Sequence, residues 1–163
     1  MREKDIQLRI IETISSGDIH HQRMTFAHEK MQHLLPITLQ SFGELTPEEI
    51  SFTDQLIYRF SKLQDLLGSK LFRLILIGLG EEVANVPFID LLNKLEKLQL
   101  IKSKDQWLNL RELRNQISHE YPYNTEEIVN GLNELCLQSL VLSGIWLSLK
   151  KYAENRFLYS GTK

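Results

Sequence analysis

Cysteine is nearly absent from this sequence: the chain has one, Cys136, so an internal disulfide is excluded. It lies in the apolar stretch LNELCLQSLVL, which suits a reducing compartment and a buried structural thiol. An excess of one charge is also lacking, because 19 basic residues face 21 acidic ones and leave a net charge of −2. A nucleic-acid-binding protein usually carries a basic excess, so any contact with RNA requires a local patch.

Long hydrophobic runs are missing as well. The N-terminus MREKDIQLRI is charged and no apolar segment follows it, which argues against a signal peptide. The most apolar run, Leu135 to Leu149, contains polar residues and is shorter than the ~20 residues that span a bilayer. We therefore expect a soluble cytoplasmic protein without membrane contact.

Motifs for metals and cofactors are absent too. The stretch HEKMQH places His28 and His33 at a spacing of i, i+5, whereas the zinc-protease helix requires histidines at i, i+4. Gly78 and Gly80 follow no predicted strand and lack the third glycine of a dinucleotide fingerprint. We expect neither a metal nor a cofactor.

Apolar residues recur at intervals of three and four, and no strand-like alternation occurs, so the sequence predicts an all-α fold. We expect a single domain over residues 1–163, with an N-terminal helix over 1–17, a core bundle over 18–153 and a flexible tail over 154–163. Gly17 is expected to end the first helix, and Pro36 to interrupt or kink the second.

Several helix boundaries can be assigned from capping residues. Thr46 and Pro47 have the types expected at the N-cap and the first turn of a helix, which either runs through or bends at Gly68 before it stops at Gly78–Gly80. Other predicted starts are Pro87, Ser103 with Gln106 behind it, and Asn124 or Thr125 with Glu127 behind.

The stretch ELRNQISHEYPYN, Glu112 to Asn124, combines packing residues with reactive ones. On a helical wheel the core stripe comprises Leu110, Leu113, Ile117 and Tyr121. Arg114 lies at the edge of this stripe, and Asn115 and His119 share another flank. Because Arg114 and His119 are roughly 140° apart on a regular helix, one copy does not aim both at one point. Two copies that meet across a symmetry axis would bring them together.

This set of side chains permits metal-independent RNA cleavage. A histidine can move a proton, and an arginine can hold a phosphate and stabilise the charge that develops on it. Asn115 can orient the histidine or bind the phosphate. The alternative is structural: Arg114 caps the last carbonyls of the helix, and His119 is a favourable C-terminal cation.

The segment RNQISHEY, Arg114 to Tyr121, resembles the Arg, four residues, His, any residue, Tyr motif of HEPN-domain proteins, and among them the HepT toxins of MNT–HepT toxin–antitoxin systems. Arg59 to Arg73 and the segment PFIDLLNKLEKL also resemble HepT-like sequences, so the likeness covers roughly residues 46 to 150. It implies a HEPN-like helical bundle, with a four-helix core and one or two extra helices.

The resemblance also implies a homodimer with its motif at or near the interface, and a metal-independent ribonuclease in which Arg114 and His119 are catalytic and Asn115 assists. In this branch, the tyrosine that matches Tyr121 receives AMP from an MNT-type nucleotidyltransferase antitoxin. Pro122 disfavours helical conformation at Tyr121, which would expose the hydroxyl group. A role of Tyr121 as a core aromatic remains open.

Another group of side chains lies on the helix that begins near Thr46. Asp54, Tyr58 and Asp65 share a flank opposite the leucine face, and Arg59 adjoins them. They are candidates for lining the cleft or contacting the partner, and the alternative is a solvated helix face. Arg59 either joins a phosphate site or pairs with an acid.

The sequence therefore predicts a HepT-like endoribonuclease of a type VII-like toxin–antitoxin pair, acting on tRNA or mRNA and not on DNA. Two alternatives remain. One is a non-catalytic subunit that binds substrate or nucleotide for a nucleotidyltransferase partner, and the other is a helical interaction protein whose motif is structural.

Overall fold

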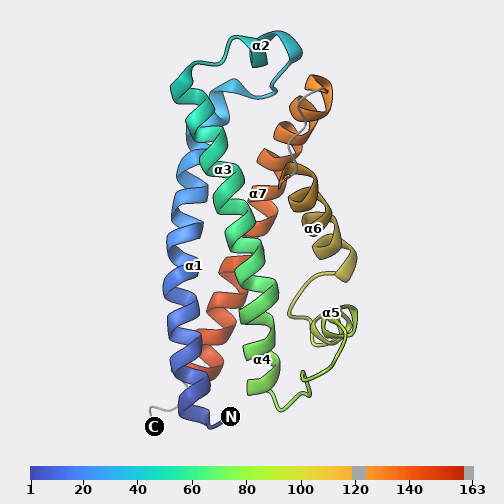
Figure 1. The fold of residues 1–163 in the computed structure, drawn as a ribbon. Helices are drawn as coiled ribbons and strands as arrows, with labels where there is room; N and C mark the ends of the chain where they lie inside the picture. The colour runs from blue at the N-terminus through green and yellow to red at the C-terminus, as the bar shows by residue number, and fades with distance from the viewer. Residues whose placement is uncertain (119–123, 160–163) are drawn as a thin grey trace.

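The computed structural model describes residues 1–118 and 124–159, and nearly all of these residues belong to helices (Figure 1). Helix accounts for 83% of the chain, and the described residues contain no β-strand, which confirms the all-α prediction. Figure 1 shows α1 (Glu3–Met31) beside α3 (Pro47–Leu66), with α7 (Thr125–Ala153) packed against both. Helix α6 (Lys104–Ser118) completes the bundle through contacts with α3 and α7.

Helix α1 does not end at Gly17 as predicted, and residues 1–17 form no separate helix. The helix continues to Met31 and is followed by a 3-10 turn, Gln32–Leu34. Gly17 is buried against the indole ring of Trp146 on α7, and a Cβ atom there would lie 2.5 Å from Trp146 Cζ2. The glycine thus permits a close approach of two helices, and the packing around it outweighs its low helix propensity.

Helix α3 begins as the sequence predicts. The Thr46 hydroxyl accepts a hydrogen bond from the backbone N–H of Glu49, and the Glu49 carboxylate accepts one from the backbone N–H of Thr46. A π-helical turn, Leu67–Leu71, contains Gly68 and leads directly into α4 (Phe72–Gly78). The predicted stop follows, with Gly80 at a φ of 81°.

The remaining elements are α2 (Leu39–Gly43), α5 (Phe88–Lys97), α6 and α7. Pro87 is the N-cap of α5, the Ser103 hydroxyl accepts from Gln106 N–H at the start of α6, and Asn124 Oδ1 accepts from Glu127 N–H at the start of α7. These three predicted starts are confirmed.

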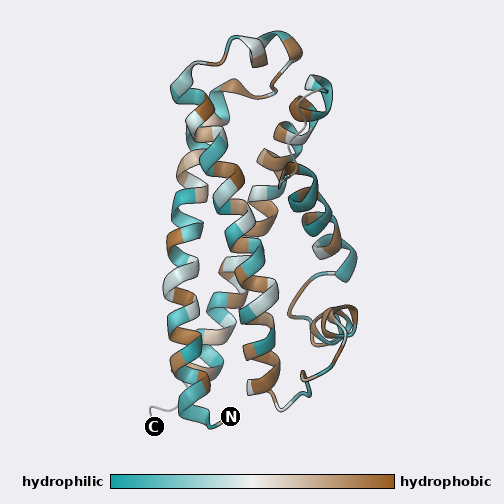
Figure 2. Ribbon diagram, in the orientation of Figure 1, coloured by the Kyte–Doolittle hydropathy of each residue, from teal (hydrophilic) through white to brown (hydrophobic). Residues whose placement is uncertain are grey.

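The core is apolar and includes both tryptophans, of which Trp107 is 1% exposed and Trp146 fully buried. Trp107 packs on Phe72 with ring centroids 4.6 Å apart. Figure 2 shows apolar and polar residues alternating along the helices, as expected when one face of each helix is buried. Cys136 is 2% exposed, and burial raises the pKa of its thiol to about 11, which fits the predicted structural role.

Within the described part of the chain, one helical segment, Thr125–Leu158, is long and apolar enough to cross a membrane by length and composition, and 39% of its apolar window is buried in the bundle. This segment is longer than the run noted in the sequence. Three leucines on its outer side are more than half exposed: Leu137, Leu140 and Leu147.

The C-terminal tail begins later than predicted. Residues Glu154–Leu158 form a π-helical turn that continues α7, so the expected flexible tail from residue 154 is wrong over these positions. The backbone carbonyl of Phe157 accepts a hydrogen bond of 2.9 Å from Gln7 Nε2, and its ring lies against Gly78. These contacts fasten the end of α7 to α1 and α4. Residues 160–163 lie outside the described residues.

Candidate functional site

The candidate site is organised around Arg114 in the last turns of α6. Its Nη2 donates a hydrogen bond of 2.9 Å to Asp65 Oδ2 on α3, and the two side chains are 33% and 46% exposed. Its Nη1 also donates to Asn115 Oδ1 at 3.3 Å. The structure therefore joins two of the predicted site residues, Arg114 and Asp65, and places Asn115 beside them.

The packing of α6 explains this position. Leu110 and Leu113 are buried, and Ile117 is partly buried against the core, as the helical wheel predicts. Arg114 lies at the edge of that stripe, so its stem leaves the core and its guanidinium group reaches the flank of α3. Asn115 is exposed. His119 and Tyr121 lie outside the described residues, so the geometry between Arg114 and His119 stays a prediction.

A hollow of about 520 Å³ opens beside the Arg114–Asp65 pair. Its aromatic side is formed by Phe88 and Trp107, and the Arg111 guanidinium group lies over the Phe88 ring at 5.1 Å. The other lining residues are Gln64, Asp65, Gly68, Ser69 and Arg73. Trp107 is buried and forms the floor of the hollow, whereas Phe88 is partly exposed. A partly exposed ring next to guanidinium groups offers a stacking surface and charge for a phosphate, which are features that bind a nucleotide.

Sequence reasoning missed Arg111 and Phe88 as site residues. A signal for Arg111 was present, because Arg111 and Arg114 are spaced i, i+3 and neighbour each other on one side of a helix. No local signal identifies Phe88, since it reaches the site from α5 through the tertiary fold.

A second hollow, of about 870 Å³, lies on the other side of α6, between α6 and α7. Three carboxylates line it: Glu112, Glu127 and Glu134. Ile117 and Gly131 are also among its lining residues. A cluster of like negative charges repels phosphate, so the side of α6 that faces α3 and α5 is the better place for a polyanion.

The predicted flank of α3 is exposed toward its N-terminal half. Asp54 is exposed and Tyr58 is 51% exposed. Arg59 lies over the Tyr58 ring at 5.0 Å, and its Nη1 is 2.9 Å from His20 Nδ1 on α1. Within the described ranges no carboxylate lies within 4.0 Å of the Arg59 guanidinium nitrogens, so the predicted pairing with an acid does not occur there.

Burial lowers the pKa of His20, and the positive charges of Arg59, Lys62 and Arg23 lower it further. A neutral imidazole is what the Arg59 contact requires, because the guanidinium group is a donor and Nδ1 must accept. His20 was not identified from sequence as a member of this flank, since its contact with Arg59 joins residues 39 positions apart in the chain. Lys62 was also missed, although it follows Tyr58 by four residues on the same helix and that spacing was a signal for it.

No group of three histidine, cysteine or acidic side chains placed to hold a metal ion occurs among the described residues. Comparisons with family models, with curated proteins and with solved structures found no match to this chain. Evidence for a function of this chain therefore comes from the geometry of the Arg114 region and from the motif that contains it.

Proposed function

We propose that this chain is a HepT-like HEPN-domain toxin, a homodimeric and metal-independent endoribonuclease. In this proposal α1, α3, α6 and α7 form the HEPN-like four-helix core, and the shorter helices are additions to it. Two copies bring their motifs together, so that Arg114 and His119 act on one phosphodiester group.

The environment of Arg114 is the observation that carries the proposal. The arginine of the motif is partly exposed and is held by Asp65, and Asp65 lines a hollow that holds two further arginines. Ion pairs with this exposure contribute only ~0–1 kcal/mol to stability. A phosphate group can therefore take the place of Asp65 at little cost, and the paired carboxylate keeps the guanidinium group oriented until then.

The reaction follows from the groups available. His119 takes the proton from a ribose 2′-OH, and the 2′ oxygen attacks the adjacent phosphorus. The bond from phosphorus to the 5′ oxygen breaks, which leaves a 2′,3′-cyclic phosphate on one fragment, and the departing 5′ oxygen takes up a proton. Arg114 stabilises the charge on the phosphoryl oxygens. Asn115 either orients His119 or binds the phosphate.

Regulation in this proposal acts on Tyr121, two residues beyond His119. A partner nucleotidyltransferase of the MNT type transfers AMP to the Tyr121 hydroxyl. The added phosphate and nucleoside then occupy the space that RNA needs beside Arg114. The modified chain is then inactive.

The test is cleavage of total tRNA by the purified protein in the presence of a chelator. We expect the wild type to produce fragments with 2′,3′-cyclic phosphate ends. His119→Ala should lower the rate ~10²–10⁴-fold, as is usual when a general acid–base is removed. Arg114→Ala should also abolish detectable cleavage. An intact-mass spectrum is recorded first, because an adduct on Tyr121 would make the enzyme inactive.

Matched controls are His33→Ala and Arg2→Ala, which remove an exposed histidine and an exposed arginine far from the motif. Both should cleave as the wild type does. Intact RNA after incubation with unmodified wild type refutes the nuclease, and equal cleavage by His119→Ala refutes its mechanism.

A second candidate function is supported by the hollow itself. Phe88, Trp107 and Arg111 form a nucleotide-sized site without any need for the motif histidine. In this case the chain is a non-catalytic subunit that presents a nucleotide to the transferase. Intact tRNA, together with calorimetric binding of ATP that is lost in Arg111→Ala, would favour this function over the first.

A further inference from the structure

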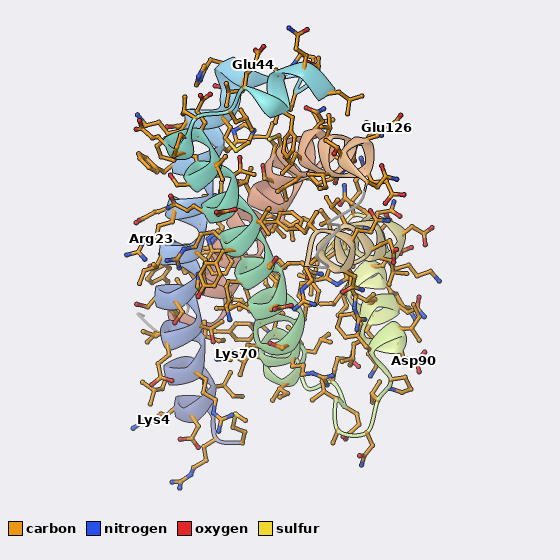
Figure 3. The ribbon with its side chains drawn as sticks, turned by 45° about the horizontal axis from the view of Figure 1, so that its top comes forward. Lys4, Arg23, Glu44, Lys70, Asp90 and Glu126 are labelled. Atoms are coloured by element: carbon orange, nitrogen blue, oxygen red, sulfur yellow. The ribbon has the colours of Figure 1, made fainter. Side chains whose placement is uncertain are left out.

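A cluster of positive charge lies between α1 and α3, away from the motif. His20 and Arg23 belong to α1, and Arg59 and Lys62 belong to α3. Arg59 Nη1 is 2.9 Å from His20 Nδ1, and the charges of Arg59, Lys62 and Arg23 all act on His20. Figure 3 shows Arg23 projecting from the outer side of α1.

The three cations of this cluster lack acidic partners in the described parts of the chain. The ion pairs there involve other cations, namely Arg2, Lys94, Arg114 and Lys150. Like charges without counter-charges repel one another, and the repulsion is relieved when an anion binds between them. In a chain whose net charge is −2, such a cluster is the local basic patch that contact with RNA requires.

His20 contributes a donor to the same place. Its Nδ1 faces the Arg59 guanidinium group, so the neutral ring carries its hydrogen on Nε2. An Nε2–H group beside two guanidinium groups and an ammonium group is complementary to the oxygens of a phosphodiester. The cluster therefore offers both charge and directed hydrogen bonds.

Tyr58 adds an aromatic surface to the cluster. Its side chain is 51% exposed, with the Arg59 guanidinium carbon at 5.0 Å and the Lys62 Nζ at 5.6 Å from the ring centroid. An exposed ring surrounded by cations is the combination on which single-stranded nucleic acids stack their bases. Double-stranded nucleic acid keeps its bases in the helix and would leave the ring unused.

The cluster continues toward Arg114 along one face of α3. Tyr58, Lys62 and Asp65 are spaced i, i+4 and i+7, so they lie in a row, and Asp65 holds Arg114 at its end. The rise from Tyr58 to Asp65 is about 10 Å. This row links the basic cluster to the proposed catalytic arginine within the length of a short stretch of single strand.

We propose that His20, Arg23, Arg59 and Lys62 bind a phosphodiester group of single-stranded RNA while Tyr58 stacks on an adjacent base, and that the strand continues along α3 to Arg114. The choice of RNA as the ligand rests on the proposed function. The cluster positions the substrate and takes no part in bond cleavage.

The experiment measures binding separately from cleavage. A fluorescein-labelled oligonucleotide with 2′-O-methyl groups has no 2′-OH nucleophile, so it cannot be cleaved, and its anisotropy is titrated with the full-length protein at several salt concentrations. We expect the double variant Arg59→Gln/Lys62→Gln to bind at least tenfold more weakly. A plot of log K against log salt concentration has a negative slope, and this slope should become less steep by about 1.4 in the variant. Each lost contact between a cation and a phosphate of a single strand lowers the steepness by ~0.7.

The matched control is Lys97→Gln/Lys102→Gln, which removes the same charge from exposed positions at the end of α5 and in the loop after it. It should bind within twofold of the wild type. Tyr58→Ala should weaken binding at an unchanged salt slope, since it removes a stacking ring and no charge, whereas Tyr58→Phe should bind as the wild type does. Circular dichroism confirms that each variant is folded.

Unchanged binding by Arg59→Gln/Lys62→Gln overturns the proposal, and so does an equal loss in the control pair. Binding that is restricted to free inorganic phosphate in calorimetry, or to phosphatidylserine vesicles, also overturns it. If the oligonucleotide binds through the cluster while tRNA stays intact, the nuclease proposal fails and the cluster proposal stands. If tRNA is cleaved but Arg59→Gln/Lys62→Gln binds the oligonucleotide as the wild type does, the nuclease proposal stands and the cluster proposal fails.

Discussion

The replacement of Gly17 by alanine tests the packing of α1 against α7. A Cβ atom at this position would lie 2.5 Å from Trp146 Cζ2, 2.6 Å from Cζ3 and closer still to Cη2. Trp146 is fully buried, so its ring cannot swing into solvent to make room. The helices would have to separate, or the ring would have to leave its preferred rotamer.

Two effects of opposite sign decide how much Gly17→Ala changes the free energy of unfolding. Alanine is favoured over glycine in a helix interior by ~1 kcal/mol. Overpacking a close-packed core costs ~1–3 kcal/mol and occasionally more. Because contacts near 2.5 Å are far inside the van der Waals distance, we expect the upper part of this range and a net loss of about 1–2 kcal/mol, given the two figures above.

Gly144 is the matched control, because it lies in the interior of α7, is exposed, and has no atom within 4 Å of an added Cβ. Gly144→Ala should therefore gain close to the full ~1 kcal/mol of helix propensity. Thermal unfolding followed by circular dichroism should show opposite shifts, with about 2–4 °C for each kcal/mol in a chain of this size.

A double-mutant cycle attributes the loss to the named contact. Trp146→Leu removes the ring that the new methyl group would meet, so the combined variant should lose at least ~0.5 kcal/mol less than the sum of the single losses. If Gly17→Ala is as stable as the wild type, or if the two losses are simply additive, the contact with Trp146 does not limit the size of residue 17.

Two further results are expected. The pKa of His20 is lowered by burial and by neighbouring cations, so the unfolded chain takes up a proton more readily than the folded chain does. The free energy of unfolding should therefore fall as the pH decreases below about 6.5. In urea titrations this fall should be smaller for His20→Gln, and an equal fall in the wild type and the variant would contradict the prediction. Cys136, with a pKa of about 11 and 2% exposure, should react with a disulfide reagent at pH 8 many times more slowly in the native protein than in denaturant, and rapid native labelling would show that α7 opens.

The predicted helix starts at Thr46, Ser103 and Asn124 are confirmed because capping is local: the side chain accepts a hydrogen bond from the backbone N–H three residues ahead. The start at Pro87 is also confirmed, without a side-chain cap, because the fixed φ of proline suits the entry into a helix. The predicted break at Gly17 is wrong for a related reason. Glycine has a low helix propensity, and only the tertiary contact with Trp146 shows that its small size matters more at this position.

The candidate site shows the same division between local and distant interactions. The position of Arg114 at the edge of a core stripe follows from the period of the helix, and it is confirmed by the burial of Leu110 and Leu113. Its pairing with Asp65 joins positions 49 residues apart, and the contact of Arg59 with His20 joins positions 39 apart. No spacing rule in the sequence predicts such pairs.

The helical character of this chain, the starts of most of its helices and the buried face of α6 can all be read from local sequence, because these properties depend on residues within one or two turns of each other. Three features follow from packing between helices instead: α1 passes through Gly17, Glu154–Leu158 continues α7, and cations of α1 and α3 gather near Tyr58. Those outcomes depend on which helix faces which, and that is set by the packing of the whole core.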